Sequence, residues 1–385
     1  MTRQTRMLAL LSGLLSVALS TASAADSERS VSFGPHAPSI LIRSAPVIAV
    51  PEAENPHRKT PFRVDNNAPS LWRGDQFILF HSWENIWRAT GSGLSSLTSD
   101  QLTHFTNPKL DYLWYWLESA FDINKTIFGY YHNEVPDVCP PRKDVMAPGY
   151  PVIAKIGAVR STDGGLTWED LGWVMGGADT DVKCVSGSPW FAGGSGDFGV
   201  LPDRDGKFYY FYFANYSPNR AEQGLAVARL AAADLEHPVG KIQRWYQGSW
   251  NEPGLNGHST PMWPSTADVY EPNTQIFWGP VIHWNTYLGK YVMVVNRTQD
   301  AAWATEGIYM SFSDDIANPA SWSAPVKIMD RAEATRGDAS KPHWNGWYAS
   351  LQGEQRGETD KRMSQRARLF IDGVSRWEVE FRKEH

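Results

Sequence analysis

The sequence predicts an all-β protein built from repeated antiparallel sheets, and three observations support this prediction. Aromatic residues are enriched, with 18 Trp, 15 Tyr and 16 Phe among 385 residues, and aromatic side chains favour strands. Gly (32) and Pro (25), which favour turns, are also frequent. The period of an amphipathic helix is nearly absent, and only residues 112–120 suggest a short helix.

A loose repeat gives the architecture. Five segments combine a Gly or Asp turn with an alternating aromatic strand: they span residues 74–81, 126–132, 205–211, 288–294 and 368–372. A strand–turn–strand unit that recurs at intervals of tens of residues is typical of a β-propeller. We therefore predict a single five-bladed β-propeller over residues 61–385, with a central channel. The long spacing between residues 214 and 278 leaves a count of six blades open.

A second motif is structural. Residues 161–168 read Ser-Thr-Asp-Gly-Gly-Leu-Thr-Trp, the S-x-D-x-G-x-T-W pattern of an Asp-box hairpin. In such a turn the Asp accepts backbone N–H groups and the Trp packs beneath it. We therefore exclude Asp163 from the catalytic candidates.

The N-terminus predicts export. Arg3 and Arg6 precede an apolar run over residues 7–19, and Ala22-Ser23-Ala24 forms a small-residue cleavage site, so residues 1–24 are predicted to be a signal peptide. The apolar run is too short to span a membrane, and a periplasmic or secreted location follows. Residues 25–60 form a polar, extended N-terminal segment, which would precede the propeller or wrap it.

Charge and cysteine content narrow the functional classes further. With 36 Lys and Arg against 42 Asp and Glu, the net charge is −6, and no basic run suggests a nucleic-acid partner. Cys139 and Cys184 are the only cysteines. In an oxidising compartment they are expected to form a disulfide, with two free thiols as the alternative. Two cysteines without a His cluster do not make a zinc site.

Polar clusters near the ends of the expected innermost strands give the candidate site. They occupy a different repeat each, at residues 65–72, 130–134, 193–199 and 278–285, with a weaker one at 344–348. In a propeller these strand ends converge at the mouth of the channel. Carboxylates in separate blades, combined with the S-x-D hairpins, resemble the five-bladed glycosidases that include arabinanases, β-xylosidases and arabinofuranosidases. The resemblance implies three channel carboxylates: a base, an acid, and one that orients the acid and tunes its pKa.

By position, Asp65 matches the base of that family and Asp197 a carboxylate of the third blade, on a Gly-rich strand that would allow close backbone approach to a ligand. Two departures are evident. The family places its Asp directly before Pro, whereas Asp65 lies four residues before Pro69, and the fourth blade offers His283 where an acidic Glu is expected. Glu134 is the better candidate acid, ahead of Glu271. Each carboxylate also has a structural interpretation, as a turn cap, an ion-pair partner or an acceptor of backbone N–H groups.

The remaining candidates would contact substrate: Asn67, Trp72, Tyr131, His132, Trp278, His283 and Arg297. Trp and Tyr rings are suited to stacking on sugars, although core packing is the alternative for each of them. No cofactor is expected. The resemblance allows a Ca²⁺ ion in the channel, held partly by His283 through water, but no ligand-spacing motif supports one.

These residues favour an exported glycoside hydrolase that acts on a carbohydrate by acid/base catalysis with inversion. Asp65 would be the base, Glu134 the acid and Asp197 the partner that tunes the pKa of the acid. Two alternatives stay open at this point. One is a carbohydrate-binding propeller without catalysis. The other is a lyase on uronic-acid polymers, in which Tyr131 or His132 removes the proton and Arg297 neutralises the carboxylate.

Overall fold

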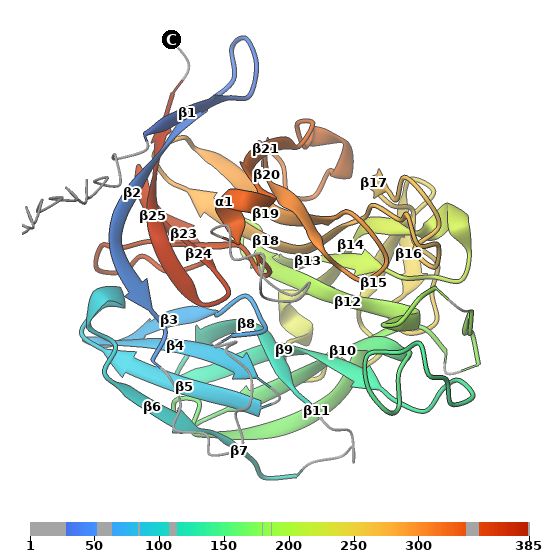
Figure 1. The fold of residues 1–385 in the computed structure, drawn as a ribbon. Helices are drawn as coiled ribbons and strands as arrows, with labels where there is room; N and C mark the ends of the chain where they lie inside the picture. The colour runs from blue at the N-terminus through green and yellow to red at the C-terminus, as the bar shows by residue number, and fades with distance from the viewer. Residues whose placement is uncertain are drawn as a thin grey trace, which may run out of the picture.

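The computed structural model describes residues 28–51, 64–83, 85–107, 114–178, 180–185, 187–335 and 346–383. In this part of the chain nearly all regular structure is β-strand (Figure 1). The helical elements here are short: α1 (Arg331–Ala334), η1 (Leu94–Ser96), η2 (Arg220–Glu222), η3 (Ala232–Asp234) and η4 (Pro319–Ser321). The short helix expected at residues 112–120 is wrong, because Trp116–Ile123 form strand β8, paired with β9.

The main strands of the described residues fall into five antiparallel sets. The first set is β3 (Ser70–Arg73), β4 (Gln76–Trp83), β5 (Asn85–Gly91) and β6 (Ser99–Leu102). The second is β8 (Trp116–Ile123), β9 (Thr126–Val135), β10 (Val152–Ser161) and β11 (Thr167–Gly176). The third is β12 (Phe191–Pro202), β13 (Phe208–Asn215), β14 (Gly224–Ala231), β15 (Gln243–Tyr246) and β16 (Ser249–Pro253). The fourth is β18 (Phe277–Asn285), β19 (Lys290–Thr298), β20 (Thr305–Ser313) and β21 (Val326–Asp330).

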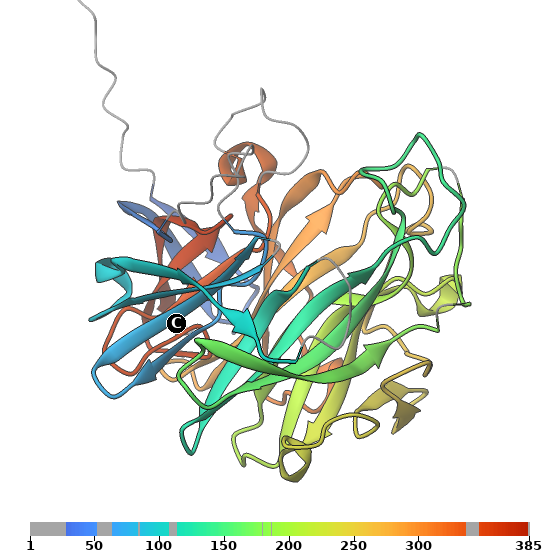
Figure 2. The same ribbon diagram turned by 90° about the horizontal axis from the view of Figure 1, so that it is seen from below.

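The fifth set combines the two ends of the described chain. Its C-terminal strands are β22 (Ser350–Gln352), β24 (Arg366–Ile371) and β25 (Val374–Arg382). Its N-terminal strands are β2 (Ser39–Ala49) and β1 (Arg29–Ser32). Strand β2 pairs antiparallel with β25, so that Ile40 lies opposite Phe381, and the blue and red strands run side by side in Figures 1 and 2. This pairing ties the start of the described chain to its end.

Short pairings complete the sheets. Strand β7 (His104–Phe105) adds to β11, β17 (Trp263–Pro264) to β14, and β23 (Arg362–Met363) to β18. A brief parallel pairing of β10 with β12 joins the second and third sets into one sheet. The five repeat segments lie on or border β4, β9, β13, β19 and β24, which are the second strands of the five sets. The repeat thus marks the hairpin at the second strand of each set.

The first strands of successive sets pack together. Strand β3 contacts β8, β8 contacts β12, β12 contacts β18, and β18 contacts β22. Ser70 on β3 donates a hydrogen bond of 2.7 Å to Gln352 on β22, which links the first set to the fifth. The ends of these strands therefore bring distant parts of the sequence close together.

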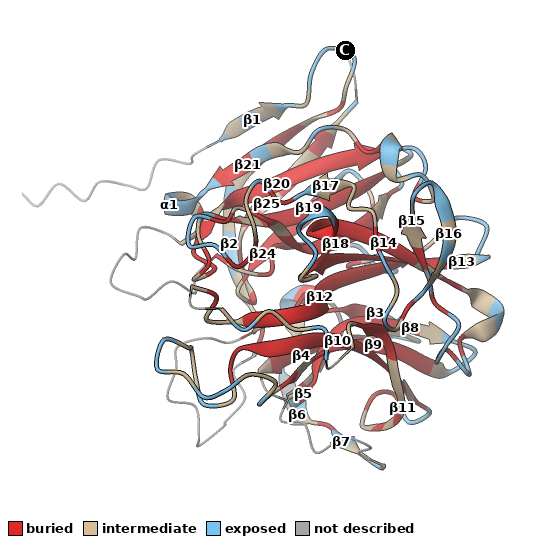
Figure 3. Cartoon of the chain, turned by 90° about the vertical axis from the view of Figure 1, so that its right-hand side faces the viewer, coloured by how far each residue is buried: buried red, intermediate tan, exposed pale blue. Residues whose placement is uncertain are grey.

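The hydrophobic core lies between neighbouring sets. Separate clusters fill the spaces between the first and second, second and third, third and fourth, fourth and fifth, and fifth and first sets. Figure 3 shows the strands mostly buried and the connecting turns exposed. Burial of aromatic and aliphatic side chains on both faces of each sheet explains the high aromatic content of the sequence. A further aromatic cluster lies near one end of the first strands, around Phe191, Trp278 and Tyr348.

Cys139 and Cys184 form the expected disulfide, which is typical of proteins that fold in an oxidising compartment. In the described part of the chain, no helix has both the length and the apolar character needed to cross a membrane.

The Asp-box forms as the motif predicts. Asp163 accepts hydrogen bonds from Ser161, from the backbone N–H groups of Leu166 and Thr167, and from the Thr167 hydroxyl. Trp168 is fully buried beneath this turn and its indole N–H donates to Thr103.

Replacing Asp163 by Ala is expected to lower the free energy of unfolding by about 1–2 kcal/mol, because several backbone and hydroxyl donors lose a charged acceptor. Urea unfolding of the two proteins measures this difference. Asp205→Ala is the matched control, since Asp205 lies in an exposed turn and pairs only with Lys207. Equal stability of the two variants would contradict the structural role of Asp163.

Candidate active site

The candidate site is a cavity with two chambers near the ends of the first strands. The outer chamber has a volume of about 280 Å³ and contains Asp65 and Asp372. The inner chamber, of about 60 Å³, contains Asp65, Glu134 and Asp197. Asp65 and four aromatic residues, Trp116, Tyr150, Trp190 and Trp347, line both chambers. The three predicted catalytic carboxylates, which come from separate parts of the sequence, thus meet at one cavity.

Asp65 lies in the segment that leads into β3, with its backbone N–H bonded to the carbonyl of Ser82. Two Asn residues fix this segment. Asn66 accepts the Ser82 N–H, and the Asn67 amide donates to the Phe198 carbonyl at 2.7 Å. The pKa of Asp65 is raised to about 7. Removal of the carboxyl from water is the largest cause, and the negative charges of Asp197 and Asp372 add to it. Asp65 is therefore partly protonated at neutral pH.

Glu134 lies near the end of β9, and the Tyr150 hydroxyl donates a hydrogen bond to its Oε2. Removal from water raises the pKa of Glu134 to about 8; the charges of Asp197 and Asp65 act in the same direction, against the opposing effect of the Tyr150 hydrogen bond. Glu134 is therefore mostly protonated at neutral pH, as a general acid must be before it acts.

Asp197 is buried on β12, at a bulge where its φ is 44°. The hydroxyls of Tyr348 (2.8 Å) and Tyr216 each donate to one of its carboxylate oxygens. Two donors of this kind suit an ionised carboxylate. Its charge contributes to the raised pKa of both Asp65 and Glu134.

The glycines around Asp197 serve protein packing. A Cβ on Gly196 would lie 2.4 Å from the His132 ring, and one on Gly194 would lie 2.1 Å from the Ala154 carbonyl oxygen. The sequence predicted that these glycines let a ligand approach the strand closely. In the structure they make room for neighbouring protein atoms instead.

His132 connects Asp197 to Glu134. Its Nδ1 accepts the backbone N–H of Asp197 at 2.9 Å, so the proton of the neutral ring is on Nε2. Burial lowers the pKa of His132, which keeps the ring neutral at pH 7. Nε2 lies 3.7 Å from Oε1 of Glu134. A neutral imidazole N–H therefore faces the acid candidate.

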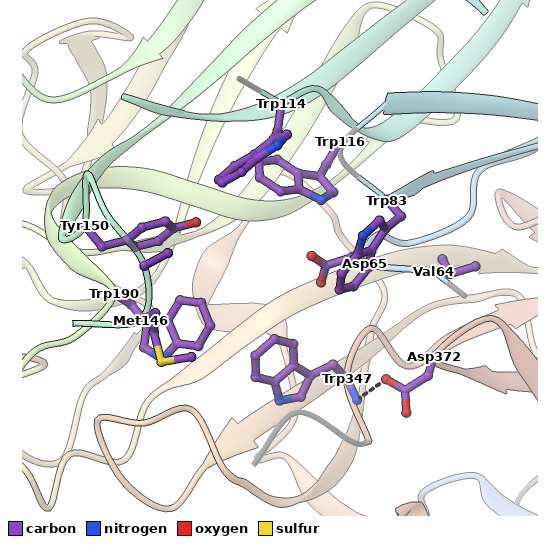
Figure 4. A pocket seen from close by; sticks show the side chains of 11 residues that line it. Val64, Asp65, Trp83, Trp114, Trp116, Met146, Tyr150, Trp190, Trp347 and Asp372 are labelled. Carbon is purple, nitrogen blue, oxygen red and sulfur yellow. Dashed lines mark hydrogen bonds between the residues drawn. The ribbon is translucent and has the colours of Figure 1, made fainter. Parts of the chain in front are cut away.

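Asp372 is a site residue that sequence reasoning missed. It lies between β24 and β25, and its two oxygens accept the backbone N–H groups of Gly346 (2.7 Å) and Trp347 (3.0 Å). Figure 4 shows the bond from Trp347. Removal from water raises the pKa of Asp372 to about 7. The repeat segment 368–372 ends at this residue, but its turn pattern predicted only a hairpin.

The aromatic wall was missed as well. Figure 4 shows rings around the outer chamber from several segments; they belong to Trp83, Trp114, Trp116, Tyr150, Trp190 and Trp347. These residues lie far apart in the sequence and share no motif. Trp347 lay in the weaker cluster predicted at residues 344–348; for the other rings the abundance of Trp was the sequence signal.

Of the predicted substrate contacts, His132 and Trp278 line the inner chamber. Tyr131 lines neither chamber, because its hydroxyl bonds to Asp170 inside the second set of strands. Trp72 donates its indole N–H to the Glu358 carbonyl, and Arg297 bonds to Gln275 at 2.7 Å. These three side chains are occupied elsewhere in the protein.

Asn67 and His283 have buried structural contacts. The backbone N–H of Asn67 bonds to Oε2 of Glu118 at 2.9 Å, so both residues brace the segment that carries Asp65. His283 donates from Nδ1 to the Asp360 carbonyl, and burial lowers its pKa to about 4, so it is neutral. Neither residue lines the two chambers.

The structure was also tested for the channel Ca²⁺ that the resemblance allows. Nε2 of His283 is buried without a hydrogen-bond partner, but a neutral nitrogen is a poor ligand for Ca²⁺, which prefers oxygen. Among the described residues, no group of three or more His, Cys, Asp or Glu side chains is arranged to hold a metal ion. These residues do not fit a Ca²⁺ site, and we assign no step to one.

The raised pKa values predict how stability depends on pH. Asp65, Glu134 and Asp372 have pKa values of about 7 to 8 in the folded protein, above the usual values for these side chains. Their contribution to stability is fully present below about pH 4 and is lost as the pH rises through 7 to 8. Asp65→Asn is therefore expected to raise the free energy of unfolding at pH 9 by on the order of 2 kcal/mol, and to change it little at pH 5.

Urea unfolding at both pH values checks this expectation, with Asp205→Asn as the exposed control. If Asp65→Asn were equally destabilising at both pH values, the buried carboxyl would not have the raised pKa.

No family model matches this chain, and no curated protein matches its sequence. Solved structures of glycoside hydrolases are similar to it. An exo-β-1,3-galactanase from Phanerochaete chrysosporium has 14% identity and a TM-score of 0.45, over 87% of this chain and 63% of the galactanase chain. An arabinanase from Bacillus subtilis has 14% identity and a TM-score of 0.41, over 83% of this chain and 94% of that one. An endo-arabinase from Bacteroides thetaiotaomicron has 11% identity and a TM-score of 0.44, over 83% and 93% of the two chains.

These neighbours include arabinanases, one of the groups that the sequence resembles. This chain spans less than two thirds of the length of the galactanase. At this level of identity the activity of the chain has to be argued from its own site.

Proposed function

We propose that this chain is a glycoside hydrolase in which Asp65 is the general base, Glu134 the general acid and Asp197 the residue that tunes both. One observation carries the proposal: three carboxylates from different strand sets meet at one aromatic cavity, where burial raises the pKa of Glu134 to about 8 and that of Asp65 to about 7. Near neutral pH the base candidate Asp65 is therefore partly ionised while the acid candidate Glu134 is mostly protonated. Base and acid are then in the protonation states that hydrolysis needs.

The reaction follows from these states. Asp65 accepts a proton from a water molecule as the water oxygen attacks the anomeric carbon. The bond between that carbon and the glycosidic oxygen breaks, and Glu134 gives its proton to the leaving oxygen. Attack by water opposite the leaving group inverts the anomeric configuration. Asp197 accepts hydrogen bonds from Tyr216 and Tyr348, and its negative charge favours the protonated form of Glu134.

We further propose that the five sets of strands are the blades of a closed propeller. The contacts between successive first strands, the Ser70–Gln352 hydrogen bond and the pairing of β2 with β25 support this arrangement. Strands β1 and β2 would then complete the fifth blade. Export of the chain is proposed as well, on the basis of the disulfide; the predicted signal peptide at residues 1–24 lies outside the described residues.

The cavity does not favour the lyase alternative. His132 lines the inner chamber, but its Nδ1 accepts the Asp197 N–H and its Nε2 carries the ring proton, so the neutral ring has no free lone pair to take a proton. Arg297 is bonded to Gln275, and Tyr131 to Asp170, outside both chambers. Among the described residues that line the chambers there is no Lys or Arg to neutralise a uronate. A carbohydrate-binding protein without catalysis is the competing outcome of the experiment.

The experiment is product formation on a panel of oligosaccharides and polysaccharides, with reducing ends and ultraviolet absorbance followed together. New reducing ends without absorbance, lost in both Asp65→Asn and Glu134→Gln, are expected. An unsaturated, absorbing product would indicate a lyase. Saccharide binding by calorimetry without any product from the panel would indicate a binding protein. NMR of the first-formed anomer tests inversion.

A further inference from the structure

The outer chamber combines aromatic walls with negative charge. Six of its lining side chains are aromatic, and Val64, Met146 and Ala147 add apolar surface. The only ionisable groups on its wall, apart from the Tyr150 phenol, are the carboxyls of Asp65 and Asp372. Figure 4 shows these two carboxyls on one side of the space and Trp114, Tyr150 and Trp190 on the opposite side. Within the described residues the wall has no Lys, Arg, Asn, Gln, Ser or Thr.

Several polar atoms on this wall already have partners. The Tyr150 hydroxyl donates to Glu134, and the Trp347 indole N–H donates to the Trp303 carbonyl at 2.9 Å. Both oxygens of Asp372 accept backbone N–H groups. For the hydroxyls of a neutral sugar this wall therefore offers mainly the Asp65 carboxyl and the Trp116 indole N–H, and a buried hydroxyl without a partner is costly.

A cationic group, in contrast, would find favourable contacts on this wall. The faces of Trp and Tyr rings attract an ammonium ion by about 0.5–2 kcal/mol per contact, and most strongly when water is excluded. A carboxylate that already accepts two N–H groups retains its negative charge and further lone pairs, so Asp372 can still attract a cation. The chamber volume of about 280 Å³ suits a single small group.

We propose that the outer chamber binds an organic ammonium group of the substrate, with Trp114, Trp116 and Trp347 around it and Asp372 as its counter-charge, which leaves Asp65 for its role as base. This inference rests on the proposed function and names its substrate class: a glycoside whose sugar or leaving group carries a positive charge. An unacetylated amino sugar and a quaternary ammonium alcohol share this chemistry.

Matched pairs of probes test the charge alone. Isothermal titration calorimetry at pH 8 compares choline with 3,3-dimethylbutan-1-ol, its neutral isostere, and methyl glucosaminide with methyl glucoside. We expect the cationic member of at least one pair to bind about 10-fold or more tightly than its neutral partner. A preference in the first pair alone indicates a quaternary ammonium, and one in the second pair alone an amino sugar. Equal binding within both pairs, or no binding of any probe, overturns the proposal.

Two variants locate the effect. Trp114→Leu is expected to weaken binding of the cation about 5-fold or more while leaving the neutral isostere within about twofold. Trp250→Leu is the control, because Trp250 packs on Tyr210 and Trp245 away from both chambers. An equal loss of affinity in both variants would overturn the assignment to this chamber.

The calorimetry measures binding and does not depend on turnover. The ammonium site and the hydrolase activity can therefore be refuted independently of each other. Cation-selective binding by a protein that hydrolyses no glycoside would refute the hydrolase and leave the ammonium site standing. Hydrolysis of neutral glycosides by a protein that shows no preference within either pair would do the reverse.

Discussion

Asp65→Asn is expected to lower kcat/KM about 10³-fold, because Asn has the shape of Asp but does not take a proton from water. The loss should be the same for a natural glycoside and for an activated aryl glycoside. In a single displacement the base assists the attack of water whichever leaving group departs. Initial rates on both substrates measure this, with Asp205→Asn as the exposed carboxylate control.

The stability of Asp65→Asn separates lost chemistry from lost folding. This variant is expected to be at least as stable as the unsubstituted protein at pH 8, because the neutral amide removes a negative charge near Asp197 and Asp372. A stable variant with more than a tenth of the original kcat/KM would remove Asp65 from the role of base.

The general architecture could be predicted from the sequence because it depends on local patterns. Alternating aromatic residues and Gly or Asp turns mark the second strands of the five sets, and the Asp-box motif fixes one hairpin by short-range hydrogen bonds. Such patterns act over a few residues, where the sequence is informative. The expected helix at residues 112–120 was wrong because Trp116–Phe121, the buried part of β8, packs between sheets, and this tertiary packing decided its conformation.

Local sequence patterns do not predict how the residues of the candidate site come together. Asp65, Glu134 and Asp197 could each be proposed from its motif, but their meeting depends on the packing of first strands far apart in sequence. On β9 the side chains alternate, so that His132 and Glu134 face the cavity while Tyr131 faces Asp170. The sequence of this strand does not say which alternate set faces the cavity. Asp372, in the β24–β25 turn, reaches the cavity by accepting the Trp347 N–H, a long-range contact, and only Trp347 lay in a predicted cluster, at residues 344–348.

Glu134→Gln is expected to lower kcat/KM on a natural glycoside by about 10²–10⁴-fold, because the leaving oxygen receives no proton. An activated aryl leaving group needs little protonation, so the loss on an aryl glycoside should be about tenfold or less. This dependence on the leaving group distinguishes an acid from a base. Gln keeps the acceptor for Tyr150 and the size of the side chain, which limits structural change.

The pH dependence of the same variant gives an independent test. In the unsubstituted protein, kcat/KM should rise as Asp65 ionises with a pKa of about 7 and fall as Glu134 ionises with a pKa of about 8. In Glu134→Gln the fall above pH 8 should disappear while the rise near pH 7 remains. A fall that persisted in this variant would assign the alkaline ionisation to another group. Asp197→Asn serves as the companion measurement: without its charge, both limbs should move to lower pH, since Asp197 raises the pKa of both residues.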